Sequence, residues 1–190
     1  MNKYEYLGLK YNPFPKTSIP RDDSLIMYDP NGYLEDIREA VEYVLTTGNS
    51  SHVVIVGPYG SGKTHLLKLT LKILEGDKKY HPIYISTPRS SFLKIYGAII
   101  DSIPLSELLS IVDSLPPSVS RALNMLNNSE HTDYIRSWLR GDKINSKIRN
   151  KIGLGSNLDV YEALDVLSKV FSRLGKVFVL LIDEFEAILD

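Results

Sequence analysis

The stretch Val53-Val54-Ile55-Val56-Gly57-Pro58-Tyr59-Gly60-Ser61-Gly62-Lys63-Thr64 decides the fold of this chain. Residues 52–56 are a short run rich in β-branched side chains, which predicts a strand buried on both faces. Gly57 to Thr64 match the spacing G-x-x-x-x-G-K-[ST], and the leucine-rich residues 66–74 predict a helix directly afterwards. Glycines in such a loop let the backbone wrap closely around a phosphate, and the helix N-terminus adds positive potential. The stretch therefore predicts a polyphosphate-binding loop.

Two side chains of this loop carry its expected chemistry. Lys63 is predicted to reach the β and γ phosphates of a nucleotide, and the Thr64 hydroxyl is predicted to ligate Mg²⁺. For Tyr59 a surface position is the alternative to nucleotide contact, and for His65 the alternative is packing within the helix. The other predicted nucleotide-binding residues surround Lys63 and Thr64: Gly57, Pro58, Tyr59, Gly60, Ser61, Gly62 and His65.

A second apolar run, Val177 to Ile182, ends directly before Asp183 and Glu184. A carboxylate at the C-terminal end of a buried parallel strand is expected beside the phosphate loop. Asp183 is predicted to bind Mg²⁺ through water, and Glu184 to orient and polarise the attacking water as general base. Glu184 and Lys63 are thus the predicted catalytic residues. The alternative is that both carboxylates only provide negative charge at the start of a helix.

The composition excludes several other classes of protein. The chain has 190 residues, 22 Lys and Arg against 23 Asp and Glu, and no cysteine. Disulfide scaffolds, thiolate zinc sites and cysteine nucleophiles are therefore excluded. No apolar run approaches the roughly 20 residues of a membrane helix, and the N-terminus lacks the apolar core of a signal peptide. We expect a cytoplasmic protein without a membrane partner.

The remaining chain predicts an α/β domain with a mainly parallel sheet, because strands alternate with helices. Four prolines make residues 1–30 an extended arm, and residues 31–190 form the core with a helical insertion at about 104–156. Further elements are expected at about 32–46 (helix), 81–88 (strand), 91–103 (helix) and 159–173 (helix). The last helix is expected to share one apolar face of Val160, Leu164, Leu167, Val170, Phe171 and Leu174.

The two quoted motifs resemble the Walker A and Walker B motifs of P-loop NTPases. The adjacent Glu184 is similar to the additional glutamate of the branch that includes AAA+ ATPases. The arm with Asn12-Pro13-Phe14-Pro15, followed by a helix and the Walker A strand, resembles AAA+ proteins of the origin-recognition and ExeA-like kind. This resemblance implies ATP and Mg²⁺ as ligands, and an arm that packs near the adenine.

A finer resemblance lies later in the chain. Ser137 to Asp142, Ile152 to Leu154 and the helix leading to Asp183 are similar to the ATP-binding proteins of BREX phage-defence systems. An AAA+ domain continues past Walker B, whereas this sequence ends at Asp190, so we expect a three-layer P-loop NTPase fold that is incomplete at its C-terminus. The alternative is a sheet in which the two Walker strands are neighbours, as in kinase-like folds.

These features predict an AAA+-like module that couples MgATP binding and hydrolysis to conformational change, in a DNA-linked process by resemblance alone. The alternatives are a nucleotide or small-molecule kinase and a non-hydrolysing nucleotide-dependent interaction module. Homo-oligomers or other AAA+ subunits are expected partners, and Arg140 is a candidate charge donor to a neighbouring subunit's phosphate.

The segment 136–151 is a candidate DNA interface. Its local charge is +5, because six basic side chains stand against Asp142 alone. Tyr134 and Trp138 beside it could stack on bases. The alternative is a solvated helical face with a buried tryptophan. The basic residues are Arg136, Arg140, Lys143, Lys147, Arg149 and Lys151.

Overall fold

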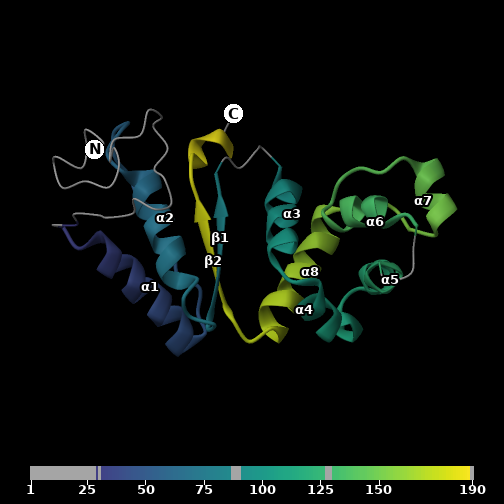
Figure 1. The fold of residues 1–190 in the computed structure, drawn as a ribbon, viewed down its shortest axis with the longest axis horizontal. Helices are drawn as coiled ribbons and strands as arrows, with labels where there is room; N and C mark the ends of the chain where they lie inside the picture. The colour runs from purple at the N-terminus through teal and green to yellow at the C-terminus, as the bar shows by residue number, and fades with distance from the viewer. Residues whose placement is uncertain (1–28, 30, 87–90, 127–129, 189–190) are drawn as a thin grey trace, which may run out of the picture. The chain divides into compact units, whose positions relative to one another are not determined.

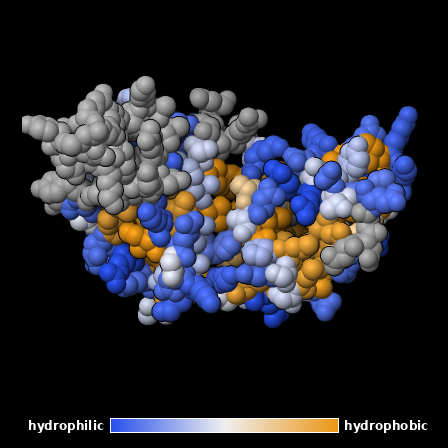
Figure 2. All heavy atoms as spheres, viewed as in Figure 1, coloured by the Kyte–Doolittle hydropathy of each residue, from blue (hydrophilic) through white to orange (hydrophobic). Residues whose placement is uncertain are grey.

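The structure is a computed structural model that describes residues 29, 31–86, 91–126 and 130–188. The chain divides into two compact units, residues 1–77 and 78–190. Each unit has buried side chains of its own. Figure 1 shows the helices and strands, and Figure 2 shows apolar residues among hydrophilic ones at the visible surface. The predicted arm falls almost entirely outside the described residues.

The described part of the first unit is a pair of helices, α1 (Tyr33–Thr47) and α2 (Lys63–Leu74). Both are amphipathic, and their apolar positions recur at three- and four-residue spacing, which gives each helix one face to bury. Helix α1 ends at Gly48, whose φ of 72° lets its N–H bond to the carbonyl of Val44. Both predicted helices are confirmed. The buried residues are Ile37 and Val41 of α1, and Leu66, Leu67, Thr70 and Leu74 of α2.

The prediction of a strand before the phosphate loop is wrong. Residues 53–56 are not part of a sheet, and the side chains of Val54 and Val56 are 83% and 89% exposed. A strand needs a hydrogen-bonded neighbour to bury its backbone, and the described residues offer this segment none. The β-branched pattern alone therefore does not predict whether a segment joins a sheet or is buried.

The described part of the second unit holds one two-stranded parallel sheet, β1 (Tyr80–Ile85) and β2 (Val177–Ile182). The register pairs Tyr80 with Val177 and Ile85 with Ile182. Ile83 and Ile85 of β1 belong to the apolar core, as do the partly buried Phe178 and Ile182 of β2. Because side chains alternate along a strand, Tyr80 and Tyr84 lie on the opposite face of β1. The prediction of a parallel sheet is confirmed for this pair of strands.

Helices make up most of the second unit (Figure 1). Helices α3 and α8 pack on each other, and α3 also packs on β1. The segment predicted as a helical insertion is a series of short helices, broken at Pro104, Pro116 and Pro117. The helices are α3 (Phe92–Ser102), α4 (Leu105–Ser110), the 3₁₀ turn η3 (Val112–Ser114), α5 (Pro117–Met125), α6 (Thr132–Leu139), α7 (Ser146–Ile152), α8 (Val160–Arg173) and the 3₁₀ turn η4 (Phe185–Ile188).

The buried face of α8 differs from the predicted one. The helix begins where predicted, since the Asp159 side chain accepts a hydrogen bond from the Glu162 backbone N–H at 2.9 Å. Leu167 and Val170 are buried as predicted, whereas Val160, Leu164 and Phe171 are exposed. The buried face is rotated about the helix axis relative to the predicted one, and it includes Ala163 and Val166 beside Leu167 and Val170. Small side chains there allow close packing on α3.

Among the residues that the structure describes, no helix combines the length and the apolar content that crossing a membrane requires.

Candidate functional site

The phosphate loop is a tight turn built by glycines at the start of α2. Gly60 and Gly62 have φ angles of 79° and 91°, which favour residues without a Cβ atom. The Ser61 N–H bonds to the Pro58 carbonyl at 3.2 Å, and Leu66 N–H closes the first helical turn on the Gly62 carbonyl at 2.9 Å. A Cβ atom on Gly57 would lie 2.7 Å from Ser61 Oγ. The loop thus has the close backbone curl that a phosphate cradle needs.

The Lys63 side chain folds over this loop. Its ammonium Nζ donates hydrogen bonds to the carbonyl oxygens of Gly57 at 2.7 Å and Pro58 at 3.0 Å. These bonds hold the positive charge inside the curl of the loop, next to the N-terminus of α2. The charge of the Lys63 ammonium and the positive end of the α2 dipole therefore both favour an anion at this loop.

The neighbours of Lys63 lie in three different environments. Thr64 is half-buried in the first turn of α2. His65 packs into the unit as one alternative predicted, and its Nε2 atom is buried without a hydrogen-bond partner in the described part of the chain. Tyr59 is 93% exposed at the tip of the loop, which agrees with the predicted surface position.

A cavity of about 710 Å³ lies against the phosphate loop within the first unit. This volume falls within the usual range of small-molecule pockets, roughly 300–1,000 Å³. Residues 53–56, Leu66 and the loop form one part of its wall. Residues at and before the start of α1 form the other part: Asp29, Asn31, Tyr33, Asp36 and Ile37.

The start of α1 is fixed at this cavity by two polar side chains. The Asp29 carboxylate accepts hydrogen bonds from the backbone N–H groups of Tyr33 at 3.0 Å and Leu34 at 2.8 Å. Asn31 Nδ2 donates to the Tyr33 hydroxyl at 3.0 Å. The sequence analysis missed this wall, because Asp29 lies three residues before the N-cap position Gly32 and therefore does not show the usual capping pattern.

Asp183 follows β2 directly, and both of its carboxylate oxygens accept hydrogen bonds. Its backbone N–H continues the ladder to the Ile85 carbonyl at 2.9 Å. Oδ1 accepts from the Glu184 N–H at 3.0 Å, and Oδ2 accepts from the Tyr84 hydroxyl at 2.9 Å. The predicted metal-binding carboxylate therefore has a defined orientation at the C-terminal end of the sheet.

Glu184 has a φ of 49°, in the left-handed region that non-glycine residues rarely adopt. Its side chain is exposed. Such conformations cost of order 1–3 kcal/mol and cluster at functional sites. The turn directs the chain away from the sheet directly after the strand, and it places two consecutive carboxylates at the strand end.

Tyr84 is the contact to this carboxylate that the sequence analysis missed. Burial raises the pKa of its phenol, and the hydrogen bond to Asp183 raises that pKa further, so the hydroxyl remains a donor at neutral pH. The sequence analysis assigned this tyrosine only to the strand predicted at about 81–88.

The acidic residues fit a magnesium ion that also takes ligands from a nucleotide. No group of three His, Cys, Asp or Glu side chains able to hold a metal occurs in the described ranges. Mg²⁺ in proteins usually keeps several waters and binds one or two carboxylates together with substrate phosphates. The Asp183 carboxylate, which is oriented by two hydrogen bonds, is a suitable donor for such an ion.

The basic segment 136–151 is only partly available as a charged surface. Arg140 Nε pairs with Asp101 Oδ2 at 3.1 Å, and Arg149 Nε donates to the Ile144 carbonyl at 3.1 Å. Trp138 is 1% exposed, with its Nε1 atom bonded to the Ser156 carbonyl at 2.8 Å, so it belongs to the core and is not available for stacking. Tyr134 is 45% exposed.

The comparisons with known proteins match most of the chain to one family. The sequence model described as "ATPase domain predominantly from Archaea" matches residues 35–190. No curated protein and no solved structure matches the chain significantly.

Proposed function

The chain belongs to the family of ATPase domains found predominantly in Archaea, which is a P-loop ATPase family, and from this premise we propose that it binds MgATP and hydrolyses it to ADP and phosphate. The phosphate loop carries this proposal, because its left-handed glycines and the enclosed Lys63 ammonium provide a preformed anion site.

In this proposal the first unit binds the nucleotide. Lys63 exchanges its bonds to the loop carbonyls for bonds to the β and γ phosphates, and the backbone N–H groups of the loop hold the same phosphates. The base and ribose occupy the rest of the adjoining cavity, between residues 53–56 and the start of α1. Tyr33 and Asn31 are positioned there to contact the base.

The second unit supplies the carboxylates in this proposal. The predicted magnesium ligands are Thr64 in the first unit and Asp183 in the second, and a bound magnesium ion would offset negative charge on the phosphates. Glu184 accepts a proton from the attacking water and orients it. The water oxygen forms the new bond to the γ phosphorus, the bond to the β–γ bridging oxygen breaks, and ADP is the leaving group.

Nucleotide binding by the wild type, Lys63→Ala and Lys72→Ala tests the proposal. Lys72 lies on the same helix near its other end and is the matched control. We expect Lys63→Ala to weaken ATP binding about 100-fold, by analogy with the loss of one preorganised charge donor, and Lys72→Ala to bind normally. Equal binding by all three proteins would overturn the assignment of the loop.

A second activity, binding of nucleic acid, is favoured by three lysines at and before α7. Lys143, Lys147 and Lys151 are exposed, and they make no ion pair with any residue that the structure describes. Such charges can follow a phosphate backbone. Arg149 instead secures the loop around α7.

Charge reversal at these lysines tests this second activity. We expect Lys143, Lys147 and Lys151 changed together to Glu to abolish binding to single- and double-stranded DNA, and wild-type binding to weaken steeply with salt. Arg173→Glu at the end of α8 is the control for the single variant Lys147→Glu, because each of them changes the net charge by −2. If DNA binding by the wild type does not change with salt concentration, these lysines only form a solvent-exposed face.

The finer resemblances are proposals as well. They comprise a three-layer AAA+-like core, coupling of hydrolysis to conformational change in a DNA-linked process, assembly with other AAA+ subunits and a cytoplasmic location. A phosphate-release assay without an acceptor distinguishes the ATPase from the kinase alternative, because an ATPase releases phosphate when no acceptor is present. The resemblance to origin-recognition, ExeA-like and BREX proteins stays a prediction.

A further inference from the structure

Tyr84 connects the two strands of the sheet at the predicted metal site. It stands one residue before the end of β1, and its hydroxyl donates to Asp183 Oδ2 at 2.9 Å across 99 positions of sequence. The parallel register pairs it with Leu181. Because Leu181 and Asp183 point to the same face of β2, the hydroxyl meets the carboxylate without bending either strand.

The contact completes the support of one carboxylate. The Glu184 N–H, from a left-handed residue, fixes Oδ1, and Tyr84 fixes Oδ2. Hydrogen bonds to charged groups contribute more to stability than bonds between neutral groups. With both oxygens held, rotation about the Cβ–Cγ bond of Asp183 is restricted before any ligand binds.

We propose that Tyr84 is a positioning residue that orients the Asp183 carboxylate for magnesium and thereby sets the Mg²⁺ concentration at which the protein binds and hydrolyses ATP. The inference rests on the proposed function. Tyr84 acts through Asp183 and not on the nucleotide, so its removal weakens the response to the metal and leaves metal-free nucleotide binding unchanged. Hydrogen-bonding partners of metal ligands typically contribute about 10- to 100-fold in metal affinity.

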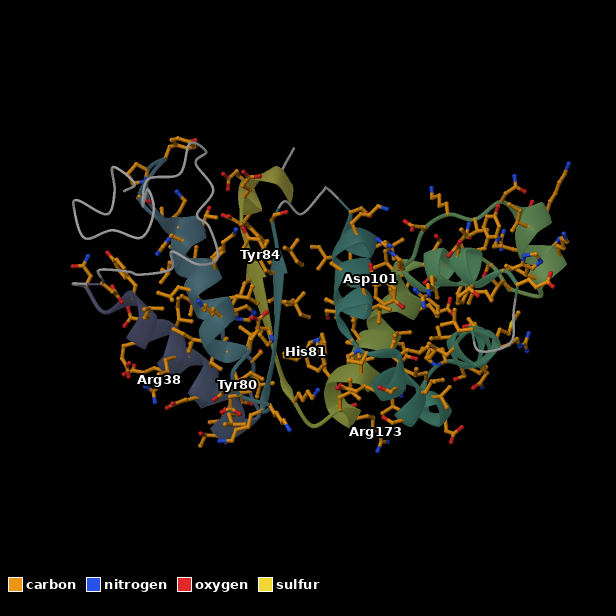
Figure 3. The ribbon with its side chains drawn as sticks, viewed as in Figure 1. Arg38, Tyr80, His81, Tyr84, Asp101 and Arg173 are labelled. Atoms are coloured by element: carbon orange, nitrogen blue, oxygen red, sulfur yellow. The ribbon has the colours of Figure 1, made fainter. Side chains whose placement is uncertain are left out.

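Tyr80 provides a matched control. It lies four residues earlier on the same face of β1, is half-buried like Tyr84, and pairs with Val177 at the opposite end of the strands. Figure 3 shows the two tyrosines at opposite ends of β1. Tyr80→Phe and Tyr84→Phe remove the same atom from the same strand, and only Tyr84→Phe removes a hydrogen bond to Asp183.

The test is titration of Mg²⁺ into the wild type, Tyr84→Phe and Tyr80→Phe, with two readouts at each concentration. The first is binding of a fluorescent ATP analogue, also measured in EDTA, and the second is phosphate release. We expect Tyr84→Phe to need about tenfold more Mg²⁺ in both readouts, with unchanged binding in EDTA. Tyr80→Phe should follow the wild-type curves.

The outcomes separate the inference from the proposed function. Identical Mg²⁺ curves for the wild type and Tyr84→Phe overturn the role of Tyr84. An equal shift of the Mg²⁺ curve in Tyr80→Phe overturns it as well. Both results leave the ATPase proposal standing. A wild type that binds ATP more tightly with Mg²⁺ but releases no phosphate contradicts hydrolysis alone, and a binding shift in Tyr84→Phe then still supports the inference. A wild type that binds no nucleotide overturns both.

Discussion

The phosphate loop and the Asp183 carboxylate are organised over different distances in the sequence. Every hydrogen bond described for the loop joins residues at most six positions apart, such as Lys63 to Gly57. The carboxylate is held by its neighbour Glu184 and by Tyr84, 99 positions away. A local motif can bring its own geometry wherever it occurs, whereas the carboxylate depends on the register of β1 against β2.

Gly62→Ala is expected to have the largest effect on ATP affinity among the following variants, and it concerns the locally organised phosphate loop. An alanine at a φ of 91° is strained by about 1–2 kcal/mol, which the loop relieves by moving its N–H groups away from the phosphates. ATP affinity should fall about tenfold. The control is Gly48→Ala, which has a similar φ of 72° at the end of α1. It should destabilise the protein similarly in calorimetry, with normal ATP affinity in binding titrations.

Glu184→Gly changes the turn after β2, and we expect it to raise stability while it abolishes hydrolysis. Glycine adopts the left-handed backbone without strain, so the free energy of unfolding should rise by about 1 kcal/mol. Hydrolysis should be lost, because the proposed base is removed. Chemical denaturation and a phosphate-release assay measure the two effects. A variant that is less stable and still active would show that the strained turn has neither role.

The smallest expected effect is on the pH dependence of stability, and it concerns His81 in β1, one of the two strands that position the Asp183 carboxylate. Burial is the main cause that lowers the pKa of His81 below its usual value of 6.5, and the Lys176 charge adds to it. Glu107 and a hydrogen bond with Ser102 act in the opposite direction.

The sign of this effect follows from proton binding. The unfolded chain binds more protons at this histidine than the folded one, so its contribution to stability is present above pH 6.5 and is lost as the pH falls below that value. His81→Asn should therefore show a smaller drop in melting temperature between pH 7.5 and 5.5 than the wild type. An equal drop would mean that His81 does not titrate differently on folding.

The same contrast explains which parts of the molecule were predictable. Helices α1 and α8 and the phosphate loop depend on local spacing and caps, such as Gly48 and Asp159, and were predicted to within about one residue. Burial was not predictable at Val54 or on the outer side of α8 at Leu164, because it depends on which other elements pack there.

The candidate site shows this limit as well. Lys63, Asp183 and Glu184 stand in recognisable motifs. Tyr84 alternates with isoleucines in an ordinary strand pattern and carries no signal of its own. Only the pairing of β1 with β2 brings its hydroxyl to the carboxylate. Trp138 is the reverse case, because a conspicuous residue in a basic segment turned out to be part of the core.

The most direct test of the proposed ATPase is the identity of the nucleotide bound after incubation with ATP and Mg²⁺, for the wild type and Glu184→Gln. We expect both proteins to bind ATP, the wild type to convert it to ADP, and Glu184→Gln to retain ATP with hydrolysis slowed about 100-fold or more. Equal ADP in both samples would contradict the role of Glu184, and the absence of bound nucleotide from both would contradict the ATPase itself.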